Sequence, residues 1–462
     1  MDIQQTSQLT AAKKWFGESI LVKLTFIGFL TLLLLIPSFA IQDLIKERQE
    51  RQEEVVSGIS DKWSGKQLVE GPVLVLPYAP SGTHIYILPE LLNINSHVDP
   101  EVLHRGIFDA VVYNTRIKVS GKFSALELVK SGIDPALVQW EKAKVMIGLS
   151  DLKGLKNNPS IKIDKMLHPL EPDFDSVSLF TNTLVTLPDL SKQKNTALDF
   201  NFELDLRGST ELTFQHLGKS TNVTVEGAWN NPSFTGRYLP EKRNITAKDF
   251  SAIWRMAHFN RTLPQQWVAK RSVLDSKPVV KQTDTKELSE DTVMPGLAIK
   301  DTTFGVKFMM GVDQYQKTMR CAKYSTLIIL LTFISLVFSE LILKKKVHFL
   351  QYILIGAAMT IYYTLLLSFS EQIGFNSAYI IASFATVVLI SSFIAALLRN
   401  RKPAIVFAGI LTIFYSFIYV IIQLQDFALI VGSIGLFIII SVTMYLSAGI
   451  DWNKREVPDD TQ

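Results

Sequence analysis

One acidic residue lies well inside an otherwise apolar run, and it is the first candidate for chemistry in this chain. Glu340 falls within residues 324–343, four residues before Lys344. An ionised side chain at the bilayer centre costs about 2.5–3.5 kcal/mol on insertion scales, so such an acid needs a partner or a function. Two interpretations are open: an ion pair with Lys344 at the membrane boundary, which we favour, or an ionisable group in a proton or ion path. Glu371 and Asp426 fall at the ends of apolar runs, where we expect them to be solvated.

Residues that commonly bind metals or act as nucleophiles form no recognisable pattern. His97, Asp99 and His104 are close in sequence, but their spacing matches no known zinc-ligand pattern. Cys321 is the only cysteine, which excludes an intrachain disulfide and a cysteine-based zinc site, and we expect it to be a small residue at the membrane boundary. The sequence lacks a nucleophile elbow, a Walker loop, a zinc-protease helix and a dinucleotide-binding loop. We therefore predict no enzymatic activity, no catalytic residue, no metal and no cofactor.

Residues 229–267 are rich in aromatic side chains and arginines, which are typical of binding hot spots. Two interpretations are open: the core of a β domain with exposed arginines, which we favour, or a face that binds a partner. The residues that would form this partner face are Trp229, Phe234, Arg237, Tyr238, Trp254, Arg255 and Trp267.

The last third of the chain contains five apolar runs, each about twenty residues long. At about 1.5 Å of rise per residue, each run matches the ~30 Å hydrocarbon core of a bilayer. A helix that faces water needs a polar side, and these runs have none. They predict a five-helix transmembrane block over residues 324–447. The runs are residues 324–343, 347–369, 377–398, 403–423 and 427–447.

An earlier apolar run predicts one more helix. Residues 24–41 carry no charge and follow Lys13, Lys14 and Lys23. A cleaved signal peptide ending at Ser38-Phe39-Ala40 is the alternative, but its apolar run is usually only about 7–15 residues long. The length favours an uncleaved anchor. We predict a cytoplasmic tail over residues 1–20, a transmembrane helix over 21–41 and a helical stalk over 42–59.

Between these hydrophobic parts the pattern changes to that of strands. Residues 198–206 alternate apolar and polar side chains, as a strand with one wet face does. Residues 211–216 and 222–225 follow, and we predict that the three are antiparallel neighbours in one sheet. The whole predicts a β-rich, sandwich-like domain over residues 60–310. It would include a long surface loop at 270–300 and a closing strand at 303–310, and a connecting helix over 311–323 would run without a break into the membrane.

Basic residues in the short loops predict the topology. Three connections are basic and alternate with two that contain no lysine or arginine, residues 370–376 and 424–426. By the positive-inside rule the basic connections are cytoplasmic. We therefore predict six spans, both termini in the cytoplasm and the large domain outside it. The net charge of +4 is small, which argues against nucleic acid as a partner. The six predicted spans make the lipid bilayer the expected partner. The basic connections contain Lys344, Lys345 and Lys346; Arg399, Arg401 and Lys402; and Lys454 and Arg455.

Several ordered segments along nearly the whole chain resemble one family, the CreD family of bacterial inner-membrane proteins. The resemblance implies an inner-membrane protein linked to cell envelope integrity and controlled by a two-component regulatory system. The family has no established catalytic residues, so the resemblance implies none here. The segments that carry it are residues 32–37, 69–74, 231–236, 238–240, 313–316, 351–352 and 370–375.

Together these patterns lead to one functional expectation and one alternative. We expect a non-enzymatic protein of the bacterial inner membrane, whose periplasmic β domain binds an unknown envelope protein or ligand. The alternative is an ion- or proton-coupled transporter that uses Glu340. An odd five-helix block, and the lack of interrupted helices in matching halves, argue against a transporter.

Overall fold

A computed structural model of the chain contains two compact units. One comprises Met1–Arg51 and Val312–Gln462, and the other comprises Gln52–Gly311. The predicted loop at residues 270–300 lies outside the described part. So do the two predicted cytoplasmic tails, residues 1–20 and 448–462, apart from residues 20 and 448. The structure describes residues 20–79, 83–126, 133–173, 179–180, 182–261, 263–269, 302–310, 314–343, 347–399, 401–424 and 427–448.

The first described element is one long helix, α2 (Ile20–Trp63), which contains Pro37 and contributes residues to both units. Its 44 residues make it about 66 Å long, roughly twice the thickness of a hydrocarbon core. The polar second half consists of good helix formers, and Arg51 Nη2 donates to Glu47 Oε1 over 2.8 Å, one turn back. The predicted anchor and stalk are therefore a single continuous helix.

The end of α2 is fixed within the β-domain unit by one aspartate. Ser64 Oγ and Gly65 N each donate to Asp151 Oδ2 over 3.0 Å. The guanidinium of Arg207 lies 5.2 Å from the centre of the Trp63 ring, a cation–π geometry. The last turn of α2 is therefore part of the β domain's packing.

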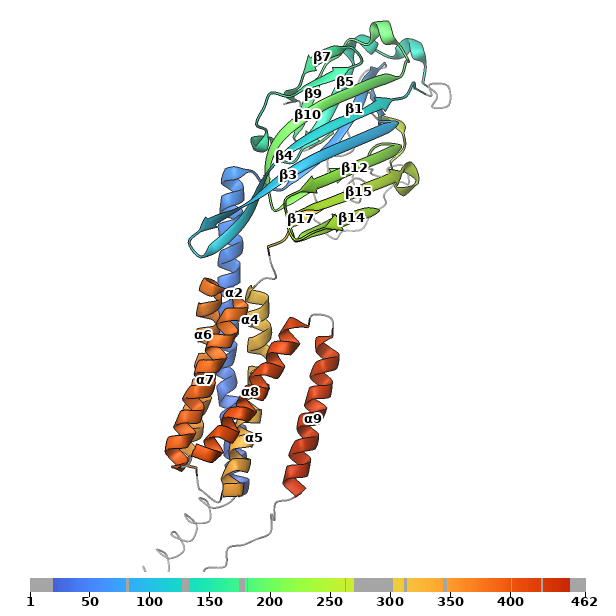
Figure 1. Ribbon diagram of the computed structural model, residues 1–462. Coiled ribbons are helices and arrows are strands. Elements are labelled where there is room, and N and C mark those ends of the chain that lie inside the picture. Colours follow the sequence, from blue (N-terminus) through green and yellow to red (C-terminus); the bar gives the residue numbers. More distant parts are fainter. Residues whose placement is uncertain are drawn as a thin grey trace, which may run out of the picture. The chain divides into compact units, whose positions relative to one another are not determined.

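Apart from the short helix α4, the remaining helices of the first unit follow the five apolar runs to within a few residues (Figure 1). His348 caps α6 in a capping box with Gln351, and Gly374, with φ of 77°, separates α6 from α7. In the described residues five helices are long and apolar enough to cross a membrane, and the bent pair α4–α5 makes six if counted as one span. The helices are α4 (Gln314–Lys323), α5 (Ser325–Leu343), α6 (Phe349–Ile373), α7 (Phe375–Leu398), α8 (Arg401–Gln423) and α9 (Ala428–Ala448).

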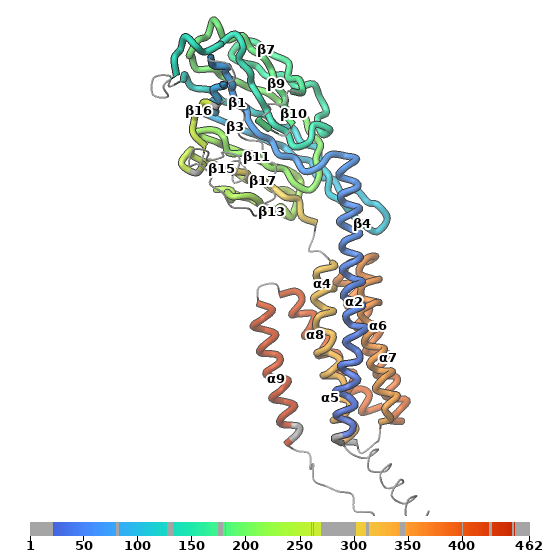
Figure 2. The backbone as a smooth tube through the Cα atoms, turned by 180° about the vertical axis from the view of Figure 1, so that it is seen from behind, coloured from blue at the N-terminus to red at the C-terminus, as the bar shows by residue number. Residues whose placement is uncertain are grey.

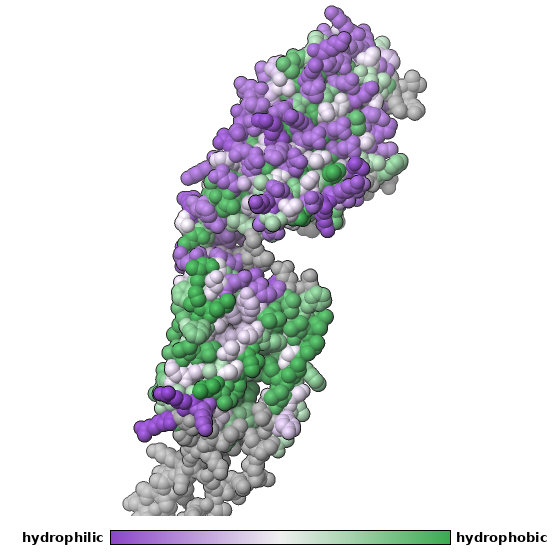
Figure 3. Space-filling model, in the orientation of Figure 1, coloured by the Kyte–Doolittle hydropathy of each residue, from purple (hydrophilic) through white to green (hydrophobic). Residues whose placement is uncertain are grey.

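The predicted unbroken helix leading into the membrane is wrong. The helix is interrupted at Tyr324, and α4 and α5 differ in direction by 42°. The composition changes at the same point: α4 is polar and basic, whereas α5 is almost wholly apolar. Figure 3 shows hydrophobic side chains over the helices, including large apolar residues of α9 that are mostly exposed, as expected for a lipid-facing surface.

The second unit consists of two β-sheets, which confirms the predicted β-rich domain. Small 3₁₀ turns join some of the strands, such as Leu152–Gly154, which is capped by Asp151. The nine-stranded sheet contains β1 (Gln67–Tyr78), β2 (Thr83–Ile87), β5 (Lys144–Leu149), β8 (Glu171–Asp173), β9 (Thr183–Thr186), β11 (Glu211–Gln215), β13 (Pro232–Gly236), β16 (Gln266–Ala269) and β17 (Thr303–Phe308). The eight-stranded sheet contains β3 (Leu91–Arg105), β4 (Phe108–Phe123), β6 (Ser160–Ile163), β7 (Met166–Pro169), β10 (Leu198–Ser209), β12 (Ser220–Gly227), β14 (Lys242–Ile245) and β15 (Phe250–Ala257).

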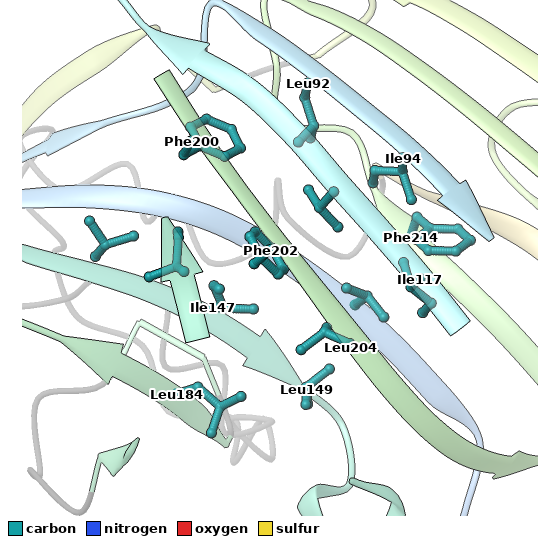
Figure 4. Close-up of a cluster of buried hydrophobic side chains, with 14 of the residues drawn as sticks. Leu92, Ile94, Ile117, Ile147, Leu149, Leu184, Phe200, Phe202, Leu204 and Phe214 are labelled. Atoms are coloured by element: carbon teal, nitrogen blue, oxygen red, sulfur yellow. The ribbon is translucent and has the colours of Figure 1, made fainter. Parts of the chain in front are cut away.

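The inward faces of the two sheets share one hydrophobic core, so the domain is a sandwich. Leu204 and Ile117 from the eight-stranded sheet and Phe214 from the nine-stranded sheet are fully buried within it (Figure 4). Burial along β10 alternates strictly from Leu198 to Leu204, as the sequence pattern predicted. The predicted closing strand is β17, which pairs with β11 and β13.

The predicted antiparallel arrangement of β10, β11 and β12 is wrong. β10 pairs with β4 and β6, while β11 lies in the other sheet and pairs in parallel with β1. β12 returns to the eight-stranded sheet, where it lies between an antiparallel β15 and a parallel β3. The chain crosses between sheets at Thr210, whose φ of 60° turns the backbone sharply. Alternation reports which side chains face inward, but it contains no information about the neighbouring strand.

Candidate intramembrane charge sites

Glu340 lies in a small polar cluster built from three helices of the first unit. Lys23 Nζ of α2 donates to Glu340 Oε1 of α5, and the two form an ion pair. Tyr352 of α6 donates its hydroxyl to the other carboxylate oxygen over 3.2 Å. The side chain of Glu340 is 9% exposed and Tyr352 is buried, its ring 5.8 Å from Phe333. Both carboxylate oxygens are therefore satisfied.

This partner differs from the one that the sequence suggested. We expected Glu340 to pair with Lys344, which lies outside the described residues, but the carboxylate is bound by Lys23, 317 positions earlier in the chain. Only the packing of α2 against α5 brings the two together. In the sequence, Lys23 is only one of three positive charges before the first apolar run.

A second cluster of the same composition lies at the opposite end of these helices. Glu371 near the end of α6 accepts a hydrogen bond from the Tyr315 hydroxyl of α4 over 3.0 Å, and Arg48 Nε of α2 lies 3.9 Å from the same oxygen. Glu371 is only 10% exposed, so the expectation that it is simply solvated is wrong. Asp426, for which we expected the same, lies outside the described residues.

Close contacts join the two clusters along α2, which runs beside α5 and α6 (Figure 2). The hydroxyl oxygens of Ser38 and Ser325 are 2.5 Å apart. A Cβ added to Gly356 would lie 2.5 Å from a methyl group of Leu34, so glycine permits this close approach of α2 and α6. We call this row of contacts, from Lys23–Glu340 through Ser38–Ser325 to Arg48–Glu371, the α2 seam.

The length of the α2 seam places both clusters near the edges of the hydrocarbon core. Lys23 and Arg48 are 25 residues apart, or about 37 Å along a helix, compared with about 30 Å of hydrocarbon. Charges at these positions are much less costly than charges at the bilayer centre. Chemically, each cluster is a neutral basic–acidic–tyrosine group that holds helices together.

The candidate partner face of residues 229–267 does not form one surface. Trp254 is 1% exposed and lies in the sandwich core, with Phe234 and Phe304 against its ring. Trp229 and Tyr238 also pack against that core. Trp267 belongs to a different cluster, where it stacks on Tyr86 with the ring centres 5.3 Å apart. Of the seven residues only Arg237 and Arg255 are exposed, as in the interpretation that we favoured.

One arginine in this region is buried, which sequence reasoning missed. Arg261 is 8% exposed and donates to the carbonyl of Leu217 and the side chain of Gln265. Gln265 in turn donates to the carbonyls of Leu88 and Pro89 over 2.6 and 3.1 Å. Burial lowers the pKa of Arg261 to about 10. The side chain thereby ties together three connections between the sheets.

No metal site forms around the histidines considered above. His104 Nδ1 is 2.5 Å from Asp109 Oδ1, whereas His97 lies between Asp99 and Glu226, 3.4 Å from each. Within the described part of the chain, no group of three or more histidine, cysteine or acidic side chains is arranged to hold a metal ion. Cys321 is a free, buried thiol, 3.9 Å from the hydroxyl of Tyr362.

His97 instead lines a groove on the outer face of the eight-stranded sheet. Four neighbouring strands align their polar side chains there, with Glu226 opposite His97, His97 opposite Arg116 and Arg116 opposite Asp205. The groove has a volume of about 660 Å³. Its lining residues are Asn95, Ser96, His97, Asp99, Asn114, Thr115, Arg116, Lys118, Lys156, Asp205, Thr224 and Glu226. We call it the polar groove.

A half-buried acid in the β domain is the clearest titrating group outside the membrane helices. The carboxylate of Glu70 lies over Gly148 beside the Phe180 ring, because a Cβ at residue 148 would be 2.8 Å from Glu70 Oε2 and 2.6 Å from Phe180 Cγ. Burial raises the pKa of Glu70 from 4.5 to about 7.

We expect Glu70→Gln to stabilise the protein at about pH 8 and to have little effect near pH 5. Between pH 4.5 and about 7 the unfolded chain releases the Glu70 proton before the folded chain does, so stability falls as pH rises, and the full cost remains above that range. The gain at high pH is at most about 3 kcal/mol. Thermal unfolding at both pH values measures it. Glu101→Gln, at an exposed strand position, is the control, and an equal gain from both variants would contradict the prediction.

These observations define a class: a multi-pass membrane protein with a β-sandwich domain between its first apolar helix and the later ones. A family model described as "Inner membrane protein CreD" matches residues 19–453. The chain is also similar to the inner membrane protein CreD of Escherichia coli (strain K12), with 25% identity over 451 residues and 94% of each chain covered. The chain belongs to the CreD family, which fits its location as a multi-pass inner-membrane protein.

Four of the seven segments on which the resemblance rests take part in contacts between the helices of the first unit. Tyr315 and Glu371, from two of these segments, are joined by a hydrogen bond. Tyr352, from a third, binds Glu340, and Leu34, from a fourth, contacts Gly356. The α2 seam therefore gives these separate segments a common structural role.

Proposed function

We propose that this protein supports the integrity of the bacterial cell envelope without catalysing a reaction. In this proposal its β domain lies in the periplasm, both termini are cytoplasmic, and expression is under a two-component system, as the family resemblance implies. The observation that carries the binding role is the polar groove, which combines charges of both signs with amides and hydroxyls. A polar envelope component with both basic and acidic groups fits this lining.

The lining residues of the polar groove retain capacity for a ligand. His97 has a carboxylate on either side at 3.4 Å, and Arg116 Nε lies 3.2 Å from Glu203 Oε1. These pairs are solvent-exposed, so each contributes little stability and can be exchanged for contacts with a ligand at low cost. Lys118 has no ion-pair partner among the described residues.

A transport function has less support from this geometry. The argument for it was an uncompensated acid in the membrane, and Glu340 is bound by Lys23 and Tyr352. These two partners occupy both carboxylate oxygens, so neither oxygen is left without a contact that a transported ion would have to replace. We therefore assign Glu340 a structural role in the proposal.

We expect Arg116→Glu to abolish the protein's contribution to envelope integrity while its abundance stays normal. The substitution reverses a charge in the middle of the polar groove, and an exposed pair contributes only about 0–1 kcal/mol to folding. The measurement is survival of detergent stress by a deletion strain that expresses the variant, with the protein level determined in parallel.

Lys307→Glu is the matched control for that experiment. Lys307 is an exposed residue on the other sheet, and its reversal should leave survival unchanged. A His97→Cys variant reports the side of the membrane, since the native Cys321 is buried: a membrane-impermeant maleimide should label the new thiol in spheroplasts. Normal survival with Arg116→Glu, or labelling only after lysis, would refute the respective part of the proposal.

A further inference from the structure

The short helix α4 carries a basic face whose role is unexplained by the sequence rules. Lys317, Arg320 and Lys323 are its only charged residues, and they recur every three positions, on one side of the helix. The opposite side is buried and consists of Tyr315, Thr318, Cys321 and Ala322. Arg320 and Lys323 are exposed, and neither has an acidic partner among the residues that the structure describes. We call Lys317, Arg320 and Lys323 the α4 basic face.

The length of α5 determines the depth of this face in the membrane. The 19 residues of α5 span about 28 Å, which already accounts for the ~30 Å hydrocarbon core. α4 therefore lies beyond the hydrocarbon, in the headgroup region, and the 42° change of direction at Tyr324 occurs at the boundary. A tyrosine is well suited to that depth, because its ring is apolar and its hydroxyl is polar.

Neighbouring polar contacts place α4 at the same depth independently. Lys317 Nζ donates to Gln423 Oε1 over 3.0 Å, and Gln423 Nε2 donates to Asn376 Oδ1 over 2.7 Å. Gln423 is the last residue of α8, and Asn376 lies in the first turn of α7. A layer of polar side chains at these helix ends is expected where hydrocarbon gives way to headgroups. The Glu371 cluster of the α2 seam lies in the same layer.

We propose that the α4 basic face binds the phosphate group of an anionic phospholipid in the adjacent leaflet. Arginine and lysine donors at headgroup depth face lipid phosphates directly, and a guanidinium can bind two phosphate oxygens at once. Each basic side chain near an anionic surface strengthens association about five-fold. The face would thus hold anionic lipid at the point where the chain enters the bundle, whichever side of the membrane this is. The inference does not depend on the proposed envelope function.

The test uses the full-length protein in vesicles of phosphatidylcholine with a minor fraction of phosphatidylglycerol. Discs containing the protein and its surrounding lipid are then excised with a copolymer, and their lipid ratio is measured. We expect the wild-type discs to be several-fold enriched in phosphatidylglycerol. The Arg320→Gln/Lys323→Gln variant should return to the bulk ratio, because two charges correspond to roughly a 25-fold loss of association.

Lys46→Gln is the matched control. Lys46 lies two residues before Arg48, at the same end of the helices as α4, but its charge is already paired with Glu50 at 3.8 Å. It should leave the enrichment unchanged. If the double variant fails to fold, the wild-type protein at high salt replaces it, because salt screens exposed charges and should remove the enrichment. Phosphatidylglycerol enrichment that survives in the folded double variant, or in high salt, would overturn the proposal. So would wild-type discs whose lipid ratio equals that of the bulk vesicles.

Discussion

Replacing Lys23 with Gln should destabilise the membrane helices by about 3–5 kcal/mol, the usual cost of leaving one member of a buried ion pair without its partner. Glu340 is 9% exposed, and in the variant only the Tyr352 hydroxyl would remain to stabilise its charge. The measurements are the amount of protein in the membrane fraction and the midpoint of thermal unfolding in detergent.

The double variant Lys23→Gln/Glu340→Gln separates an ion pair from a titrating site. Removing both charges should restore most of the lost stability, because two amides can hydrogen-bond without a buried charge. Arg51→Gln, which removes an exposed pair on the same helix, should change stability by only about 0.3–0.5 kcal/mol. The single variant Glu340→Gln completes the comparison. If the stability losses of the two single variants simply add up in the double variant, Lys23 and Glu340 are not a coupled pair. A stable double variant that fails in the cell would restore an ion-path role for Glu340.

The second large effect is expected in the sandwich core. Trp254→Ala should lower the unfolding free energy of the β domain by about 3–5 kcal/mol, since it removes a 1% exposed indole. It also removes the hydrogen bond from Trp254 Nε1 to the carbonyl of Tyr238, which is 3.0 Å long. Thermal unfolding followed by near-ultraviolet circular dichroism measures the change.

The neighbouring residue provides the control for this prediction. Arg255 points away from the core, is exposed and lies 3.9 Å from Glu241, so Arg255→Ala should change stability by less than about 0.5 kcal/mol. If these residues instead formed a partner face, the two substitutions would weaken binding together and leave stability similar. An unaltered unfolding midpoint for Trp254→Ala would therefore reopen the partner-face interpretation.

Charges within the membrane unit illustrate how far sequence analysis could reach. It recognised that Glu340 must be compensated, because the cost of a charge in hydrocarbon depends only on the type of residue and its depth. It named Lys344, which lies outside the described residues, and it missed Lys23 because it considered only neighbours in the chain. Lys23 and Glu340 are 317 positions apart, and no local pattern encodes their contact. The burial of Glu371 was missed for the same reason, since its partners belong to α2 and α4.

What the sequence determined by itself was the periodicity and length of the elements. Apolar runs of about twenty residues define membrane helices, and alternation defines strands, because both follow from the local geometry of the backbone. Only the tertiary structure decided which strands are neighbours, which aromatics are core, and which helix supplies the counter-charge to Glu340. These depend on contacts between distant segments, whose free energy arises from packing and burial and not from any local preference. The β10–β11 crossing and the α2 seam are the two clearest results of that packing.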